Sequence, residues 1–63
     1  MKSVKSVQRA ISVLFAVTQS KKPIGLSGIS RQIKLDKATV LRLLATLEES
    51  KLVQKDPVTK TYT

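Results

Sequence analysis

The feature that most constrains the fold is a pair of short amphipathic segments within residues 29–47, with only a few residues between them. Ile29 and Ile33 lie four residues apart, which places both side chains on one face of a helix. A second apolar series then recurs at steps of three and four residues: Val40, Leu43, Leu44 and Leu47. Two helices joined by a turn of three or four residues meet at a steep angle. The pattern therefore predicts a helix-turn-helix.

The residues between the two segments suit such a turn. Ser30 lies where the second helix must come closest, and its small side chain allows that approach. We expect Leu35 to fill the inside of the turn. Asp36 directly precedes the second helix of the pair and can cap it by accepting hydrogen bonds from its free amides. The two helices are predicted at residues 28–34 and 37–50.

A further helix is predicted upstream, at residues 6–19, because apolar residues recur there at helical spacing. Its main core stripe is expected to be Val7, Ala10, Ile11, Leu14 and Phe15. A second apolar side is formed by Val13, Ala16 and Val17. A helix that is apolar over so much of its circumference needs cover on two faces. We favour cover by the rest of the domain, and the alternative is a dimer contact through this helix, joined by Val4.

Turn-forming residues separate this helix from the pair. Pro23 lacks an amide proton and Gly25 tolerates a positive φ, so we expect residues 20–25 to form a turn. Ser27 can then cap the helix at 28–34, with Leu26 packed beneath it.

After the third helix, residues 52–55 and 60–63 have the composition of two short strands, and the Asp56-Pro57 pair between them is typical of a turn. A hairpin in this position is a wing. The expected fold is therefore mostly α: a three-helix winged helix-turn-helix whose wing spans residues 52–63. Because the chain stops while the second strand is still running, we expect these 63 residues to be one domain of a longer protein.

Composition argues against an enzyme and against a cofactor. The chain has no histidine and no cysteine, which excludes disulfides and the usual zinc sites. Its four acidic residues are a helix cap, a turn residue and the Glu48-Glu49 pair at a helix end, which is not a catalytic arrangement. The longest apolar run, Val13 to Val17, is far shorter than the roughly 20 residues that span a bilayer. We expect a soluble, cytoplasmic protein without membrane contact.

The charge is concentrated in one part of the chain. The formal net charge is +8, from 12 Lys and Arg against 4 Asp and Glu. Residues 1–47 contain nine of the basic residues and one acid, Asp36, whereas residues 48–63 contain three of each kind. Such an excess is either a solvated surface or a site for a polyanion. Its coincidence with a helix-turn-helix favours a nucleic acid.

The predicted helix at 37–50 presents an exposed face that suits a DNA groove. At about 100° per residue, this face is centred near Ala38, Arg42, Ala45 and Glu49, and it is flanked by Leu41 and Thr46. Glu49 lies at its far end, and residues 37–47 contain no acid. In a helix-turn-helix, the amino-terminal turns of the second helix meet base edges. Arg42 can grip guanine through two acceptors, while Ala38 and Leu41 offer apolar contact to a thymine methyl.

Other residues are expected to bind the DNA backbone or its surroundings. Lys37 and Thr39 can contact phosphate with help from the amides at the helix amino terminus. The remaining candidates for DNA contact are Ser27, Arg31, Thr46 and Lys60. Two alternatives stay open, since Arg42 can instead pair with Glu49 or be solvated, and Leu41 can instead pack under the wing.

Distinctive residue patterns occur in three segments: Ser6 to Leu14, Pro23 to Ser27 and Thr39 to Leu47. The most specific pieces are Arg9-Ala10, at the entry to the first helix, and Thr39-Val40 with Arg42-Leu43-Leu44 and Thr46-Leu47. Together they resemble the amino-terminal winged helix of IclR-type transcriptional regulators. The resemblance implies a bacterial regulator that binds a palindromic double-stranded DNA operator as a homodimer or tetramer. It also implies a separate carboxy-terminal domain that binds a small-molecule effector.

The chain departs from the family pattern in and around the turn. Lys34 stands where the family usually has glycine, at a left-handed position that costs another residue roughly 1 kcal/mol or more. Asp36 stands where proline is common, Ala38 where serine or threonine is common, and Leu41 where a polar or aromatic residue is usual. These differences bear on the operator sequence more than on the fold.

A second function is also compatible with this fold, because winged helices serve as protein-interaction or dimerisation modules without DNA binding. We favour sequence-specific DNA binding, with the helix at 37–50 in the major groove, because the basic charge and the acid-free face coincide.

Overall fold

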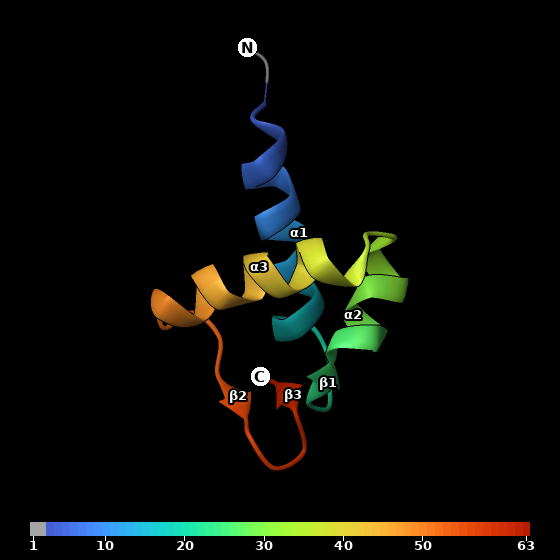
Figure 1. The fold of residues 1–63 in the computed structure, drawn as a ribbon, viewed down its shortest axis with the longest axis vertical. Helices are drawn as coiled ribbons and strands as arrows, with labels where there is room; N and C mark the ends of the chain where they lie inside the picture. Colours follow the sequence, from blue (N-terminus) through green and yellow to red (C-terminus); the bar gives the residue numbers. More distant parts are fainter. Residues whose placement is uncertain (1–2) are drawn as a thin grey trace.

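The computed structural model describes residues 3–63 and confirms a mostly α winged helix-turn-helix. Three helices pack around one core: α1 (Lys5–Thr18), α2 (Leu26–Ile33) and α3 (Lys37–Glu49). Three short strands form a sheet in the order β1-β3-β2: β1 (Ile24–Gly25), β2 (Lys55–Asp56) and β3 (Thr61–Tyr62). Figure 1 shows α3 crossing α1, with the strands gathered at the end of the molecule away from the start of α1.

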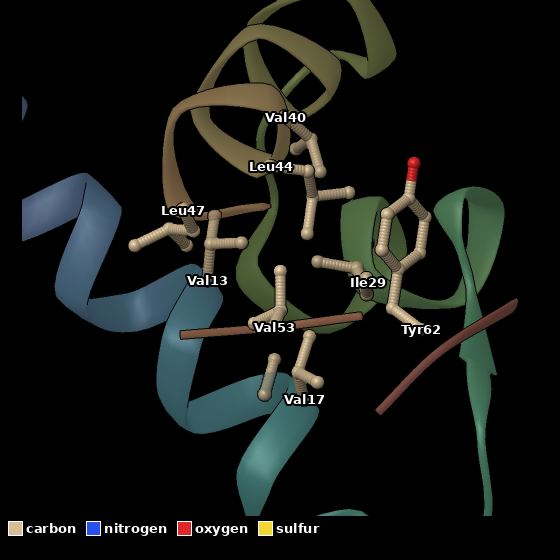
Figure 2. Close-up of a cluster of buried hydrophobic side chains, with 9 residues drawn as sticks. Val13, Val17, Ile29, Val40, Leu44, Leu47, Val53 and Tyr62 are labelled. Carbon is tan, nitrogen blue, oxygen red and sulfur yellow. The ribbon is translucent and has the colours of Figure 1, made fainter. Parts of the chain in front are cut away.

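The core lies where the three helices meet the sheet (Figure 2). The predicted inward faces of α2 and α3 are confirmed, since Ile29, Val40 and Leu44 are fully buried. Leu35, predicted to fill the turn, packs against this centre and is half-buried. The other buried residues are Val13, Ala16, Val17, Leu47, Val53 and Tyr62. Apart from the Tyr62 hydroxyl, the buried side chains within residues 3–63 are hydrocarbon, so apolar packing holds this core together.

The core stripe predicted for α1 is wrong at Val7, Ile11 and Phe15, whereas Leu14 is half-buried and packs against the core. Val7, Ile11 and Phe15 are each about half exposed, and the buried residues of this helix come from its other apolar side. Both sides recur at helical spacing, so periodicity alone could not tell which one is packed. In the structure, the amino-terminal half of α1 extends away from α3, and the helix reaches the core mainly through its carboxy-terminal half (Figure 1). The rest of the domain therefore leaves the first side largely uncovered.

The predicted start of the next helix is also wrong. α2 begins two residues before Gly28, and its N-cap is Gly25, which makes no side-chain hydrogen bond. Ser27 is therefore an exposed residue of the first helical turn, not the cap. A Cβ placed on Gly28 would lie only 3.1 Å from the side chain of Ile24, so this glycine allows α2 to pack closely against β1. Leu26 packs against the core as expected.

The sheet contains a strand where the sequence predicted a turn. Ile24 and Gly25 pair antiparallel with β3, opposite Tyr62 and Thr61 respectively. The predicted hairpin is present as β2 and β3, but β2 begins at residue 55 and not at 52. The chain leaving α3 first turns back on the helix, where the amide at residue 52 donates to the carbonyl of Leu47. That turn delays the start of the strand.

Candidate nucleic-acid interface

The amino-terminal half of α3 presents a basic exposed side. Lys37, Ala38, Leu41 and Arg42 are all exposed. Ala38 and Arg42 lie opposite the buried residues of the helix, and Lys37 and Leu41 lie toward one flank. Residues 37–47 contain no acidic side chain. Leu41 is 47% exposed, so the alternative that it packs under the wing is wrong. This side of α3 is therefore free for an approaching surface that is anionic and partly apolar.

The Asp36 carboxylate fixes the first turn of α3. One oxygen accepts from the Thr39 amide at 3.0 Å and the other from the Thr39 hydroxyl at 2.7 Å, which confirms the predicted cap. These hydrogen bonds hold the pKa of Asp36 below its usual range, and the bond from the Thr39 hydroxyl has a larger effect than the bond from the Thr39 amide. The charge of Arg42 also lowers this pKa. Because the cap uses the hydroxyl proton, Thr39 can donate to a phosphate only by breaking this bond.

Two hydrogen bonds between Ser30 and Leu35 stabilise the turn between α2 and α3. The Ser30 carbonyl accepts from the Leu35 amide at 3.3 Å, and the Ser30 hydroxyl donates to the Leu35 carbonyl. Lys34, the C-cap of α2, adopts the left-handed conformation, with φ 59° and ψ 43°. This is the geometry that usually favours glycine at a helix end. The turn fixes the direction in which α3 leaves the motif.

The exposed side of α2 carries two of the sequence-predicted residues. Ser27 and Arg31 lie four residues apart and are both exposed, so they share one face of the helix. Ser27 lies in the first turn, where the backbone amides have no partner within the helix. An anion can be bound at such a position by the amides together with the hydroxyl.

The wing places Lys60 on a well-defined turn. One Asp56 carboxylate oxygen accepts from the amides of Val58 and Thr59, at 2.9 and 3.3 Å. These two hydrogen bonds lower the pKa of Asp56, and the bond from the Val58 amide has the larger effect. The Lys60 amide donates to the Asp56 carbonyl at 2.7 Å, and its side chain is exposed. The ammonium group therefore extends from an ordered turn between β2 and β3.

Thr46 lies apart from the other candidates on α3. Its hydroxyl donates to the carbonyl of Arg42 at 3.2 Å, and its side chain borders an apolar groove between α1 and α3. This groove is lined mainly by Val7, Ile11, Leu14 and Leu52. The structure thus leaves Lys37, Ala38, Leu41 and Arg42 exposed in the first turns of α3 and puts Thr46 on the flank facing α1. The sequence did not predict this groove, although Val7, Ile11 and Leu14 in its lining belong to the predicted core stripe of α1.

Residues 3–63 contain no group of three side chains able to hold a metal ion. Within the same residues, none of the helices combines the length and the hydrophobicity needed to cross a membrane.

Comparison with known families agrees with this geometry. A family model described as the IclR helix-turn-helix domain matches residues 6–57. The matched span contains α2, α3 and the turn between them, most of α1, and the wing as far as β2. There is no match among curated proteins or among solved structures.

Proposed function

Because the chain belongs to the IclR helix-turn-helix family, we propose that it is the operator-reading module of a bacterial transcriptional regulator. Family membership supports a DNA-binding regulatory domain. The proposal adds that the domain reads a specific double-stranded sequence, with α3 in the major groove, in the cytoplasm of a bacterium. The observation that carries it is the exposed side of the amino-terminal part of α3, where residues 37–47 contain no acid and the Asp36 cap fixes the first turn.

Three residues of α3 are proposed to read base edges. Arg42 donates two hydrogen bonds to guanine, and Ala38 and Leu41 contact thymine methyl groups. Their common exposure on one side of the helix supports this assignment. The pairing of Arg42 with Glu49 is the competing arrangement, and it would remove the guanidinium group from the groove.

The remaining candidates are proposed to bind the backbone. Lys37 and Arg31 contribute charge, Ser27 binds phosphate with the free amides of α2, and Lys60 approaches from the wing. Thr39 and Thr46 are the weaker candidates, because each hydroxyl already donates within the domain.

Fluorescence anisotropy with labelled duplexes tests base reading. We expect Arg42→Ala to weaken binding to a selected operator by roughly 5- to 150-fold, the range for a lost bidentate base contact, and to change binding to random duplexes much less. Arg9→Ala, which removes the same charge from an exposed position on α1, is the matched control and should have a small effect on both. An equal loss on both duplexes would make Arg42 a phosphate contact.

The salt dependence of the same titrations tests DNA binding itself. The logarithm of the affinity should fall linearly with the logarithm of salt concentration, with a slope of about −0.9 for each phosphate neutralised. Affinity that stays constant between about 50 and 200 mM salt would contradict the proposed function and favour the protein-interaction alternative.

The proposal includes a homodimer that contacts a palindromic operator through two copies of α3. Support comes from Val4, Val7, Ile11 and Phe15, which lie along one side of α1 and are between 46% and 61% exposed. In a symmetric dimer, the same patch of both copies can bury itself against its equivalent. The two recognition helices would then read half-sites about one DNA turn, roughly 34 Å, apart.

Sedimentation equilibrium of the domain tests this dimer. Ile11→Lys places a charge in the centre of the exposed apolar side, so we expect it to convert a dimer into a monomer. Ser12→Lys adds the same charge about a quarter-turn away along the helix circumference and should leave the dimer intact. A wild-type domain that is monomeric at about 100 μM would contradict dimerisation through α1.

A further inference from the structure

Three residues other than glycine have a positive φ within residues 3–63, and all three are lysines. They are Lys34 at 59°, Lys51 at 62° and Lys60 at 58°. Glycine adopts this left-handed conformation readily, whereas the Cβ of a lysine comes too close to the following carbonyl oxygen. Each position would therefore suit glycine with less strain, and what lysine adds in each case is an exposed positive charge.

Helix dipoles account for part of this series. A cation is favoured near the carboxy-terminal end of a helix, where the dipole is negative. Lys34 is the C-cap of α2, and Lys51 directly follows the C-cap of α3. Lys60 ends the turn between β2 and β3 and has no helix end beside it. Helix dipoles therefore do not explain why lysine recurs at all three positions.

Lys34 differs from Lys51 in its position relative to the candidate interface. It lies three residues before the first residue of α3, at the end of that helix that faces DNA under the proposed function. The nearest acid in the sequence, Asp36, is occupied by its two hydrogen bonds from Thr39. The Lys34 side chain is exposed, so its ammonium can approach an external anion.

Lys51 lies at the opposite end of α3. The 13 residues of α3 span about 20 Å at 1.5 Å per residue, which exceeds the distance of roughly 8–10 Å over which charges act at physiological salt. Lys51 also follows closely after Glu48 and Glu49, and its amide donates to the Glu48 carbonyl at 3.0 Å. It shares the backbone conformation and the charge of Lys34 but not its location.

We infer that Lys34 binds a DNA phosphate beside the groove entered by α3, and that this contact offsets the strain of a left-handed lysine in the turn. The inference rests on the proposed function and adds a residue that is not among the contacts assigned above. Lys60, also left-handed and also among the candidate contacts, would make the equivalent contact from the wing.

Anisotropy titrations with duplex DNA, at several salt concentrations, test the inference. Lys34→Gly removes the charge and leaves a residue that fits the left-handed turn, so the fold is preserved, which circular dichroism can check. We expect about a 5- to 10-fold loss of affinity near 0.1 M salt and a salt slope that is shallower by about 0.9, the value for one phosphate contact. Lys34→Arg retains the charge and should bind within twofold of the wild type.

Lys51→Gly is the matched control, because it makes the same replacement at the same conformation, and it should bind within twofold of the wild type. The inference is overturned if Lys34→Gly binds like the wild type, or if Lys51→Gly loses as much affinity as Lys34→Gly. The wild-type titration separates this result from failure of the proposed function. A wild-type domain without salt-dependent DNA binding would overturn both.

Discussion

At the residue scale, the beginning of α3 depends on the Asp36 carboxylate, which accepts from both the amide and the hydroxyl of Thr39. Without this side chain, the first amides of the helix would have only water as a partner. A proline at position 36 has no side-chain acceptor, and the hydroxyl of a serine or threonine cap offers one oxygen where the carboxylate offers two. A single exposed acid in an otherwise basic segment thus has a structural role that its charge alone would not suggest.

Asp36→Ala is expected to lower the melting temperature at neutral pH by about 4–8 °C, the size of effect for a lost N-cap in a small domain. The folded state has the lower pKa, so the stabilisation by Asp36 is present above the ordinary aspartate pKa, near 3.9, and is lost as the pH falls through the folded value. The difference between wild type and variant should therefore shrink in acid, as measured by circular dichroism from about pH 7 to 2. Glu49→Ala, at the other end of α3, is the control and should change little.

The left-handed lysines allow a second prediction at this scale. Lys60→Gly should raise the melting temperature by a few degrees, because it relieves backbone strain without removing a charge from a helix end. Lys51→Gly should raise it less, because the favourable interaction with the dipole of α3 is lost at the same time. Equal increases for the two variants, measured at the same salt concentration, would show that the dipole has no part in placing these lysines.

At the scale of elements, the helix-turn-helix could be predicted because its information is local. The spacing of Ile29 and Ile33, the position of Leu35 and the Asp36 cap all act within a few residues of one another, and the structure agrees with each. The side of α1 that packs could not be predicted, because it depends on how the other helices cross it. For the same reason β1 was not expected, since a strand of two residues exists only through its pairing with β3.

A pair of variants in α1 tests which side of the helix supports the fold. Val13→Ala should cost about 1–3 kcal/mol of unfolding free energy, because Val13 is fully buried and its removal leaves a cavity. Val7→Ala removes the same atoms from a residue that is 54% exposed and should cost about 0.5 kcal/mol or less. The unfolding free energies of the two variants are compared by urea denaturation, at a protein concentration below that at which the domain dimerises. Comparable losses would mean that the first apolar side is also packed within the monomer.

The candidate interface could be predicted only in part. The sequence placed Ala38 and Arg42 on the exposed face of α3 with Leu41 at its flank, and all three are exposed in the structure. The sequence did not predict that Thr46 borders the groove beside α1. The surroundings of a residue on the flank of a helix depend on where the neighbouring helix lies, and the spacing of residues within α3 does not show this. The left-handed Lys34 was anticipated only by comparison with a pattern that has glycine there.

At the scale of the whole molecule, a small core is combined with a large excess of positive charge. A domain of this size buries only about 60% of the surface that its unfolded chain exposes, so the margin of stability is small. The net charge of +8 adds self-repulsion, which opposes the compact state. Salt should therefore act in opposite directions on folding and on DNA binding.

Raising the salt concentration from about 20 to 200 mM is expected to increase the melting temperature by a few degrees, because the repulsion is screened. A Lys21→Glu, Lys22→Glu variant, altered in the exposed loop after α1, changes the net charge from +8 by two for each replacement, to +4. Its melting temperature should depend less on salt. A wild-type melting temperature that falls over this range would show that attractive charge pairs outweigh the repulsion.

Gly25 is both the last residue of β1 and the N-cap of α2, and it lies opposite Thr61 of the central strand. No linker therefore separates the sheet from the helix pair. Under the proposed function, a displacement of the wing against the DNA backbone would act through β1 directly on the start of α2, and from there through the Ser30–Leu35 turn on α3. The same connection would then set the angle of the wing and the angle of α3 on DNA together.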